Sequence, residues 1–273
     1  MWQLQNTNNK QGALGRHLQP HAQEISSLTL SCFSYPETMC THPVLTSCAR
    51  LRHDAFCMKH QWEPVVEDGL EVDQYDPNSH HVVLAANFSG ESRQAETVLA
   101  YLRLVDGTKY SFESETHIVP MLATQAEIPS DIRKKIEQGR SLEISRFCIN
   151  TRRVNKITTK CGMDIKPSDL NLLMACKLCH KILPEVESFV AILEPWLCRQ
   201  IKKQGLNIKQ IGEPINHRGI RFPVEIDMHD QQNRYLVNYL DTIFNTVLAG
   251  KMKTQTYGYA ATWPVHHVGL LDS

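Results

Sequence analysis

The sequence lacks an excess of charge of either sign, because 29 lysines and arginines balance 29 aspartates and glutamates among 273 residues. This balance argues against a general nucleic-acid binder, which would carry a basic surface. The chain also lacks an apolar run of the roughly 18 to 20 residues that a membrane helix needs. We therefore predict a soluble protein without a nucleic-acid partner or a transmembrane segment, and contact with a membrane surface stays open.

A secretory signal and a regular cysteine spacing are missing as well. No amino-terminal segment combines positive charge with a following apolar stretch, and the nine cysteines follow no repeated spacing. Such a chain fits a reducing compartment better than it fits a disulfide-stabilised secreted domain. The predicted location is the cytoplasm.

Composition and length are those of a folded domain. Hydrophobic residues make up 42% of the chain and charged residues 21%, which excludes wholesale disorder. Residues 1–41 are rich in Gln, Asn, Ser, Thr and His, so we predict a flexible arm there, with a short apolar segment at residues 27–33. The folded domain is predicted over residues 42–250, followed by a tail over residues 251–273.

Hydrophobic periodicity predicts alternating helices and strands along this domain. Apolar residues recur at helical spacing from Pro43 to Gln61, and proline suits the first turn of a helix. Strands are expected over residues 80–88, 97–105, 141–149, 188–193, 206–215 and 219–227, and later helices over residues 129–138, 168–184, 195–204 and 235–248. This order indicates one α+β (α/β sandwich) domain, with a mixed sheet flanked by helices.

The predicted strand at residues 141–149 carries the strongest candidates for chemistry. Side chains alternate between the two faces of a strand, so Glu143 and Ser145 are expected on one face and Arg146 on the other. A carboxylate beside a hydroxyl, followed by a guanidinium, suits amide formation. It offers a base for an incoming amine and donors for an oxyanion.

An acidic segment precedes the predicted strands. Residues 63–76 contain no lysine or arginine and six acids, which are Glu63, Glu67, Asp68, Glu71, Asp73 and Asp76. Two interpretations stay open, a solvated loop and an acidic mouth for a cationic acceptor. Arg103 ends a predicted apolar strand, and it needs a carboxylate or phosphate partner if it is buried.

Cysteine and histidine motifs give weaker signals. Residues 176–180, Cys-Lys-Leu-Cys-His, match a haem attachment pattern, but they lie within an apolar helical pattern in a chain without an export signal. We interpret these cysteines as core residues, with haem or zinc as the alternative. Cys148 is an alternative nucleophile for which the sequence places no partner histidine. The histidine pairs at 80–81 and 266–267 lack the i, i+4 spacing of helical metal ligands, so no metal site is predicted.

Nine residues in the first half of the chain form a further pattern. An Arg is followed by a Phe four residues later, a Trp ten residues after the Arg, two Asp three apart, an Arg on a strand and a Glu-x-Ser-Arg. The residues are Arg52, Phe56, Trp62, Asp73, Asp76, Arg103, Glu143, Ser145 and Arg146. This set resembles the acyl-homoserine-lactone (autoinducer) synthase superfamily. The resemblance implies the GNAT N-acyltransferase fold, with a mixed, splayed sheet, and acyl transfer from a fatty acyl thioester to a small amine.

The later half carries a second group of motifs. They are Leu-Glu-Pro at 193–195, Cys-Arg at 198–199, Gly-Leu at 205–206, Ile-Gly-Glu-Pro at 211–214, His-Arg-Gly at 217–219 and Arg-Phe-Pro at 221–223, together with Gly-Leu-Glu at 69–71 and Ser-His at 79–80. They resemble the acyltransferases named for association with PEP-CTERM/exosortase systems, a branch close to the N-acyl amino acid synthases. This resemblance implies an amino acid as the acceptor.

The segment after the central strand departs from the GNAT pattern. A glycine-rich loop that holds the pyrophosphate of coenzyme A should lie there, whereas residues 150–164 contain a single glycine and offer Arg152, Arg153 and Lys156. Residues 131–160 carry nine lysines and arginines against three acids. We therefore expect an acidic acyl-carrier protein rather than coenzyme A to present the thioester, and no cofactor that stays bound.

By this resemblance, the amine attacks the thioester carbonyl directly, without an acyl-enzyme. We assign Glu143 as the base, acting directly or through water, and Ser145 with nearby backbone N–H groups as oxyanion donors. An ion pair of Glu143 with Arg103 or Arg146 is the alternative interpretation.

The other matched residues are expected to shape the acceptor pocket. The residues predicted to form a buried ion-pair network are Arg52, Asp73, Asp76, Arg103 and Arg146. Phe56 and Trp62 are expected to cover the acceptor or the acyl chain, or else to lie in the core.

Two other functions stay open. One is an acyl-homoserine-lactone synthase that uses S-adenosylmethionine. The other is a catalytically silent GNAT-like module that binds acyl-carrier protein or an acylated ligand. Retention of Glu143, Ser145 and Arg146 favours catalysis.

Overall fold

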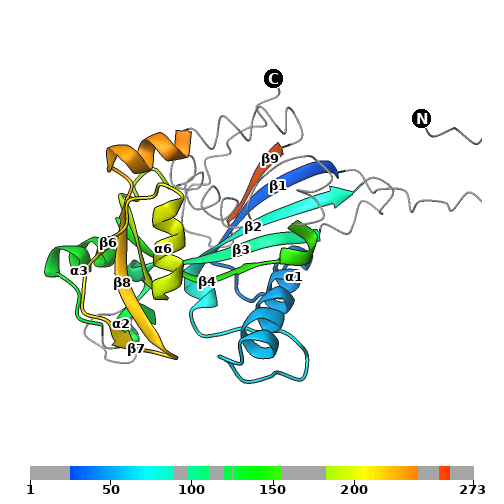
Figure 1. Ribbon diagram of the computed structural model, residues 1–273. Coiled ribbons are helices and arrows are strands. Elements are labelled where there is room, and N and C mark those ends of the chain that lie inside the picture. The colour runs from blue at the N-terminus through cyan, green and yellow to red at the C-terminus, as the bar shows by residue number, and fades with distance from the viewer. Residues whose placement is uncertain are drawn as a thin grey trace, which may run out of the picture.

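The computed structural model describes residues 25–88, 97–110, 120–124, 126–154, 183–238 and 252–258 (Figure 1). Its strands are β1 (Ile25–Ser34), β2 (Ser79–Phe88), β3 (Thr97–Val105), β4 (Ser141–Ile149), β5 (Ser188–Leu193), β6 (Lys209–Gln210), β7 (Ile215–Asn216), β8 (Ile220–Asp227) and β9 (Met252–Gly258). Its helices are α1 (Pro43–Arg52), η1 (His53–Lys59), η2 (Asp76–Asn78), η3 (Gly107–Lys109), α2 (Pro120–Ala123), α3 (Ser130–Glu137) and α6 (Pro195–Lys203). Residues 151–154 and 231–238 are also helical.

The strands form one mixed sheet. Its order is β6-β8-β5-β4-β3-β2-β1-β9, and β7 pairs with β8. Neighbouring strands are antiparallel except for two parallel pairs, β1 with β9 and β4 with β5. The predicted α+β class, with a mixed sheet flanked by helices, is confirmed.

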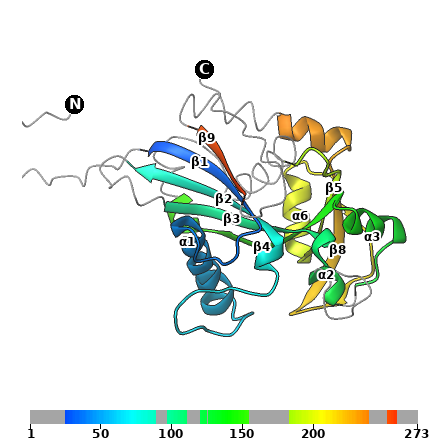
Figure 2. The ribbon, with the colours of Figure 1, turned by 180° about the vertical axis from the view of Figure 1, so that it is seen from behind.

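Hydrophobic side chains cover both faces of the sheet. Successive residues of β2 point to opposite faces. Leu84 belongs to the core cluster that contains Cys198 of α6, whereas Val83 belongs to the cluster that contains Leu45 of α1. The sheet is therefore a central layer with α6 on one face and α1 on the other, and Figure 2 shows this arrangement from behind.

Strand β1 lies inside the sheet, between β2 and β9. Leu30 and Cys32 are core residues, and the alternating Thr29 and Ser31 are buried as well, at 2% exposure each. The prediction of a flexible arm over residues 1–41 was therefore wrong for β1. Its serine and threonine content resembles a loop, but a strand with neighbours on both sides and cover on both faces buries these small polar residues. Strand β9 pairs with β1, so the predicted tail also contributes to the sheet.

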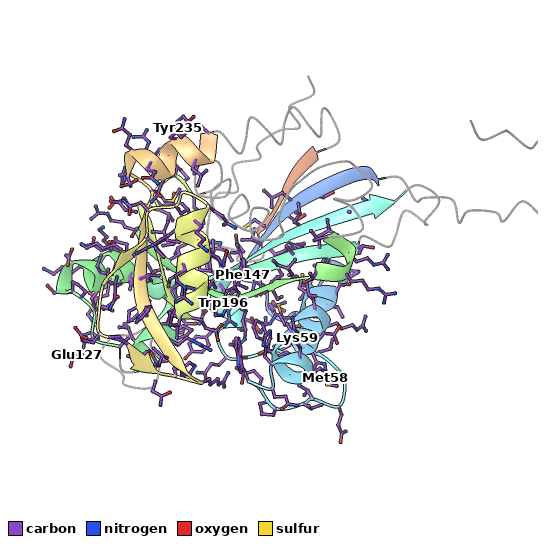
Figure 3. All side chains as sticks on the ribbon, in the orientation of Figure 1. Met58, Lys59, Glu127, Phe147, Trp196 and Tyr235 are labelled. Carbon is purple, nitrogen blue, oxygen red and sulfur yellow. The ribbon has the colours of Figure 1, made fainter. Side chains whose placement is uncertain are left out.

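The predicted helix over residues 43–61 is present, but its second half changes type. After α1, the chain continues as the π-helix η1, in which the His60 N–H donates to the Ala55 carbonyl oxygen at 3.0 Å. Such π turns are rare, but they are frequently found at functional sites. Met58 and Lys59, at the end of η1 and labelled in Figure 3, are exposed to solvent. The change of helix type thus comes where the chain leaves the packed helix and enters the acidic segment.

Strands β4 and β5 run side by side only at their starts. Their pairing joins Ser141, Leu142 and Glu143 of β4 to Ser188, Phe189 and Val190 of β5. Strand β5 then goes on pairing with β8 as far as Leu193. The two halves of the sheet therefore diverge beyond Glu143, which is the splayed geometry that the resemblance implied.

The remaining predicted elements have mixed outcomes. The strands expected at 80–88, 97–105, 141–149 and 188–193 and the helices expected at 129–138 and 195–204 are confirmed within a few residues, and the strand pair expected over 206–227 appears as β6, β7 and β8. Other predicted features lie outside the described residues, namely the motif at 176–180, Lys156, the histidines at 266–267, almost all of the helix at 168–184 and most of the helix at 235–248. Among the described residues, no helix is long and apolar enough to cross a membrane.

Candidate active site

Strand β4 presents Glu143 and Ser145 on one face of the sheet. In the antiparallel pairing with β3, Glu143 lies opposite Val105 and Ser145 lies opposite Arg103. Because Arg103 and Val105 are two residues apart on their strand, they share a face and their partners share it with them. The carboxylate and the hydroxyl therefore lie on one face, as the alternation predicts.

Arg146 does not follow this alternation. The pairing of β4 with β3 slips by one residue, so that Arg146 and Phe147 together lie opposite Leu102. Arg146 has a φ of 49°, in the left-handed region that residues other than glycine seldom adopt. The bulge turns the Arg146 side chain to the face of Ser145, so the prediction that it points to the opposite face was wrong.

Arg103 is fully buried on β3 and has three polar partners. Its Nε donates to Ser145 Oγ at 3.0 Å, and its Nη1 donates to Asp73 Oδ1 at 2.5 Å and to Asp76 Oδ1 at 2.7 Å. A buried guanidinium without such partners would be strongly destabilising. The need for a carboxylate partner, expected from the sequence, is met by two aspartates of the acidic segment.

Arg52, the last residue of α1, is equally buried. Its Nε donates to Glu71 Oε2 at 2.5 Å, and its Nη1 donates to Asp76 Oδ1 at 2.7 Å and to the Tyr101 hydroxyl at 3.3 Å. Asp76 thus accepts hydrogen bonds from both buried arginines, and it joins α1 to the centre of the sheet.

Arg146 contacts three acids through one nitrogen. Its Nη2 lies 2.8 Å from Glu63, 3.0 Å from Glu71 and 3.0 Å from Asp73. Its side chain is 21% exposed, so this corner is reached by solvent. We define the ion-pair network as Arg52, Arg103, Arg146, Glu63, Glu71, Asp73 and Asp76.

Most of the acidic segment is part of this network. Glu71 and Asp76 are buried, at 4% and 1% exposure, whereas Glu67 and Asp68 are exposed. Burial by itself would raise the pKa of Asp76, but the two adjacent arginines hold that pKa well below its ordinary value. The solvated-loop interpretation was therefore wrong for the network acids, which arginines from other elements neutralise.

His81 and Tyr101 hold two members of the network, Asp76 and Arg52, in place through hydrogen bonds. His81 Nε2 lies 2.9 Å from the Asp76 carbonyl oxygen, which only accepts, so this nitrogen carries the proton. Burial lowers the pKa of His81 to about 4, which keeps the ring neutral. Its Nδ1 then accepts from the Tyr101 hydroxyl at 2.8 Å, and that hydroxyl accepts from Arg52.

Glu143 is buried beside the network without joining it. One carboxylate oxygen accepts from the Met121 N–H at 2.8 Å, while Oε1 has no hydrogen-bond partner among the described residues. Burial raises the pKa of Glu143 to about 8, against smaller opposite effects of the Met121 N–H and of Arg103. No ion pair with Arg103 or Arg146 is seen, so this alternative finds no support in the described part of the chain. A buried carboxyl with a free oxygen and a raised pKa can take up a proton near neutral pH.

Phe56 and Trp62 stack on one another at the edge of the network, with ring centroids 6.0 Å apart. The Arg146 guanidinium lies 5.4 Å from the centre of the Phe56 ring, and the Arg221 guanidinium lies 5.1 Å from the centre of the Trp62 ring. Phe56 is buried in the core cluster of α1, and Trp62 is half-buried against that cluster. Both aromatic rings therefore pack in the core and also hold arginines in place.

The basic segment after β4 is described only in part. Residues 151–154 form a short helical turn in which Arg152 is exposed and Arg153 is half-exposed. Val154 is fully buried in the core, which anchors the turn to the sheet. Neither arginine forms an ion pair with another described residue.

Cys148 is a poor candidate for a nucleophile. It is buried in the cluster that contains α1, and burial raises the pKa of its thiol to about 12. A neutral thiol is a weak nucleophile. Within the described part of the chain, no group of three or more His, Cys, Asp and Glu side chains is placed to hold a metal ion.

Several site residues were not singled out from the sequence. Glu63 was visible only as a member of the acidic segment, and Glu71 also as part of a family motif without an assigned role. Tyr101 was visible only as a residue of an apolar strand, and His81 only in a histidine pair without metal-ligand spacing. Arg218 belongs to a family motif for which the sequence predicted no role. In the structure it forms an ion pair with Glu63. The signal that links these residues is pairing across the sheet, which a linear pattern does not reveal.

Comparison with known proteins places this geometry in context. Residues 37–236 match the family model described as autoinducer synthase. No curated protein matches the chain.

Several solved structures share the fold. A CoA-dependent acyl-homoserine lactone synthase, BjaI, with SAM and isopentyl-CoA, has a TM-score of 0.55 at 22% identity over 83% of this chain and 93% of that chain. The AHL synthase LasI has a TM-score of 0.54 at 17% identity, over 78% of this chain and 96% of that chain. The CoA-dependent acyl-homoserine lactone synthase MesI has a TM-score of 0.52 at 15% identity, over 78% of this chain and 95% of that chain. The GNAT-like arrangement of an open, mixed sheet flanked by helices is thus common to these structures and this chain.

Proposed function

The chain belongs to the autoinducer synthase family of acyltransferases, and from this premise we propose that it moves a fatty acyl group from a thioester to the amine of an amino acid or a similar small acceptor. The observation that carries the proposal is the environment of Glu143. It is a buried carboxyl with a raised pKa and one oxygen that has no hydrogen-bond partner among the described residues, placed where β4 and β5 begin to diverge.

The proposed step is direct attack of the amine nitrogen on the thioester carbonyl carbon. The new C–N bond forms as the C–S bond breaks, and the thiol of the donor leaves. Glu143 takes the proton that the amine loses and passes it to the leaving sulfur. Ser145 and nearby backbone N–H groups stabilise the oxyanion. Arg103 donates to Ser145 Oγ, which leaves the hydroxyl hydrogen available for this task.

Apolar surface beside the diverging strands supports a fatty acyl donor. Phe147 of β4 is half-buried, and Trp196 at the start of α6 is 51% exposed (Figure 3). Aromatic rings that are partly accessible offer apolar surface to a bound chain. We expect the acyl chain to run along these side chains.

The family match also supports a second candidate, an acyl-homoserine-lactone synthase that uses S-adenosylmethionine. Four acids near the site would suit a sulfonium ion, but four arginines neutralise them, namely Arg52, Arg103, Arg146 and Arg218. The balance of charge favours a zwitterionic amino acid. The resemblance of the later-half motifs to the PEP-CTERM/exosortase-associated branch supports the same acceptor class.

A transfer assay with purified protein separates these candidates. Acyl thioesters of one chain length, on acyl-carrier protein and on coenzyme A, would be offered with each amino acid and with S-adenosylmethionine. Thiol release would be followed in time and the products weighed by mass spectrometry. An N-acyl amino acid is the expected product. A lactone product would support the second candidate, and no product with any amine would contradict acyl transfer.

Acyl-carrier protein is the proposed donor, because Arg152, Arg153 and Lys156 give the segment after β4 a basic character. Reversing the charge of the two described arginines, in R152E/R153E, is expected to raise KM for the acyl-carrier-protein donor about tenfold or more. KM for the coenzyme A thioester should change less than threefold. Equal effects on both donors, in a protein with an unchanged melting temperature, would contradict docking of a carrier protein at this segment.

The raised pKa of Glu143 predicts the pH dependence of turnover. A base acts in its ionised form, and with a pKa of about 8 this form increases tenfold per pH unit below that value. kcat/KM is therefore expected to rise with pH up to about 8 and then to level off. The midpoint should stay near this value for acceptors whose amine pKa values differ by one unit or more. A midpoint that follows the acceptor would assign the titration to the amine instead.

The proposed setting is a cytoplasmic enzyme with peripheral contact at most with membranes. Six described cysteines are free thiols, which fits a reducing compartment.

A further inference from the structure

Glu63 is held by two arginines that come from distant parts of the chain. Arg218 donates from Nη1 to Glu63 Oε1 at 2.6 Å and from Nη2 to Oε2 at 3.0 Å, so the guanidinium and the carboxylate form a two-pronged pair. Arg146 donates to Oε1 at 2.8 Å. This is the geometry with which arginines recognise a free carboxylate.

Arg218 is presented by a tight turn between β7 and β8. It has a φ of 52° and is followed by Gly219 with a φ of 102°, and the His217 N–H donates to the Gly219 carbonyl oxygen at 3.0 Å. Arg221 supports the turn, because its Nη2 donates to the Arg218 carbonyl oxygen at 3.1 Å while its guanidinium covers the Trp62 ring. A backbone conformation that arginine seldom adopts is thus maintained where it directs one guanidinium towards the network.

The two arginines around Glu63 lie on the accessible side of the network. The side chains of Arg218 and Arg146 are 37% and 21% exposed, and that of Glu63 is 17% exposed. Arg52 and Arg103, by contrast, are at 0% and 1%. A solute from the solvent can therefore reach Arg218 and Arg146. Arg52 and Arg103 are buried and stabilise the fold.

The charges of this region constrain what can bind. With Arg218, the network holds four arginines and four carboxylates, so its formal charge is zero. An amino acid whose amine has lost its proton brings one negative charge. Charge balance is kept if one internal carboxylate leaves, and Glu63 is the acid that, among the described residues, pairs with both accessible arginines.

We propose that Arg218 and Arg146 bind the carboxylate of the acceptor, and that Glu63 occupies this carboxylate site when no acceptor is present. The proposal rests on acyl transfer to an amine and specifies the acceptor as an amine that bears a carboxylate. Arg146 directly follows Ser145 on β4, so a carboxylate held there places the neighbouring amine towards the face that carries Ser145 and Glu143.

The test compares an acceptor amino acid with its primary amide, which keeps the amine and loses the carboxylate charge. The amino acid is the one acylated fastest in the transfer assay, or glycine against glycinamide if none is acylated. Both KM in the assay and Kd by titration calorimetry without donor are measured. Wild type should bind the acid at least tenfold more tightly than the amide. R218Q should weaken binding of the acid about tenfold and of the amide less than twofold, because one charge-assisted pair is lost.

Glu63 and a distant ion pair provide the matched variants. E63Q removes the internal competitor and should tighten binding of the acid by threefold or more. R140Q breaks the exposed pair of Arg140 with Glu187 and should leave the ratio of acid to amide unchanged. Equal binding of acid and amide to wild type, or an unchanged ratio in folded R218Q, would overturn the carboxylate site. Absence of acylated product with preserved selectivity in calorimetry would overturn the proposed function and support the site.

Discussion

Replacing Glu143 by glutamine is expected to lower kcat by about 10²- to 10⁴-fold and to leave the fold intact. Glutamine has the shape of glutamate and its amide oxygen still accepts from the Met121 N–H, but it cannot take the proton of the amine. KM for the donor should change little. The measurement is steady-state transfer with the acceptor at saturation, together with the circular dichroism of both proteins.

A second buried glutamate provides the control. Glu225 on β8 is 5% exposed and pairs with Lys135 at 3.0 Å, away from the network. E225Q should keep kcat within threefold of wild type. Near-normal turnover in E143Q would exclude Glu143 as the base, whereas equal losses in both variants would point to a general effect of neutralising a buried carboxylate.

The same substitution, which lowers turnover, is expected to stabilise the folded protein at alkaline pH. The pKa of Glu143 is about 8 in the folded chain, against an ordinary value of 4.5, so the folded state retains the proton to higher pH than the unfolded chain. The free energy of unfolding of wild type therefore falls as pH rises from about 4.5 to about 8, and E143Q does not share this loss. Urea titrations should show the variant more stable at pH 9 by roughly 5 kcal/mol, and equal to wild type at pH 4.

Replacing Arg103 by methionine is expected to lower the free energy of unfolding by about 3–5 kcal/mol. The guanidinium is buried, and its removal leaves Asp73 and Asp76 with one positive partner fewer inside the protein. It also removes the donor to Ser145 Oγ, so turnover should be lost as well. Urea unfolding at pH 7 measures the loss of stability.

Two further variants distinguish the effect of leaving buried carboxylates without a positive partner from the effect of losing a large side chain. R103M/D76N removes one negative charge together with the positive one, and should be more stable than the sum of the two single changes predicts. R140Q at the exposed pair with Glu187 should lose less than about 1 kcal/mol. Strict additivity, or equal losses in R103M and R140Q, would contradict a network that depends on compensating buried charges.

Much of the fold could be predicted from periodicity, because strands β2 to β5 and helices α1, α3 and α6 are apolar enough to show their period. The shared face of Glu143 and Ser145 could be predicted as well, because alternation on a strand is a property of the backbone. Strand β1 could not, because its buried serines and threonines depend on neighbours from later in the chain.

The site was predicted where its residues stand in a fixed pattern and missed where it depends on tertiary pairing. The bulge that turns Arg146 results from a one-residue shift in the pairing of β4 with β3. The sequence around Arg146 does not predict this shift. The burial of Glu71 depends on Arg52, 19 residues earlier, and the position of Glu63 depends on Arg218, 155 residues later. An acidic run therefore looks solvated until its arginines are placed.

Untargeted mass spectrometry of lipid extracts from a heterologous host tests most directly that this chain is an N-acyltransferase whose base is Glu143. Extracts from cells with wild type and with E143Q would be compared at equal levels of soluble, folded protein. Acylated amines present with wild type and absent with the variant are the expected result, and their fragments would identify the acceptor and the length of the acyl chain. Identical sets of acylated amines in both extracts would contradict the assignment of Glu143 as the catalytic base.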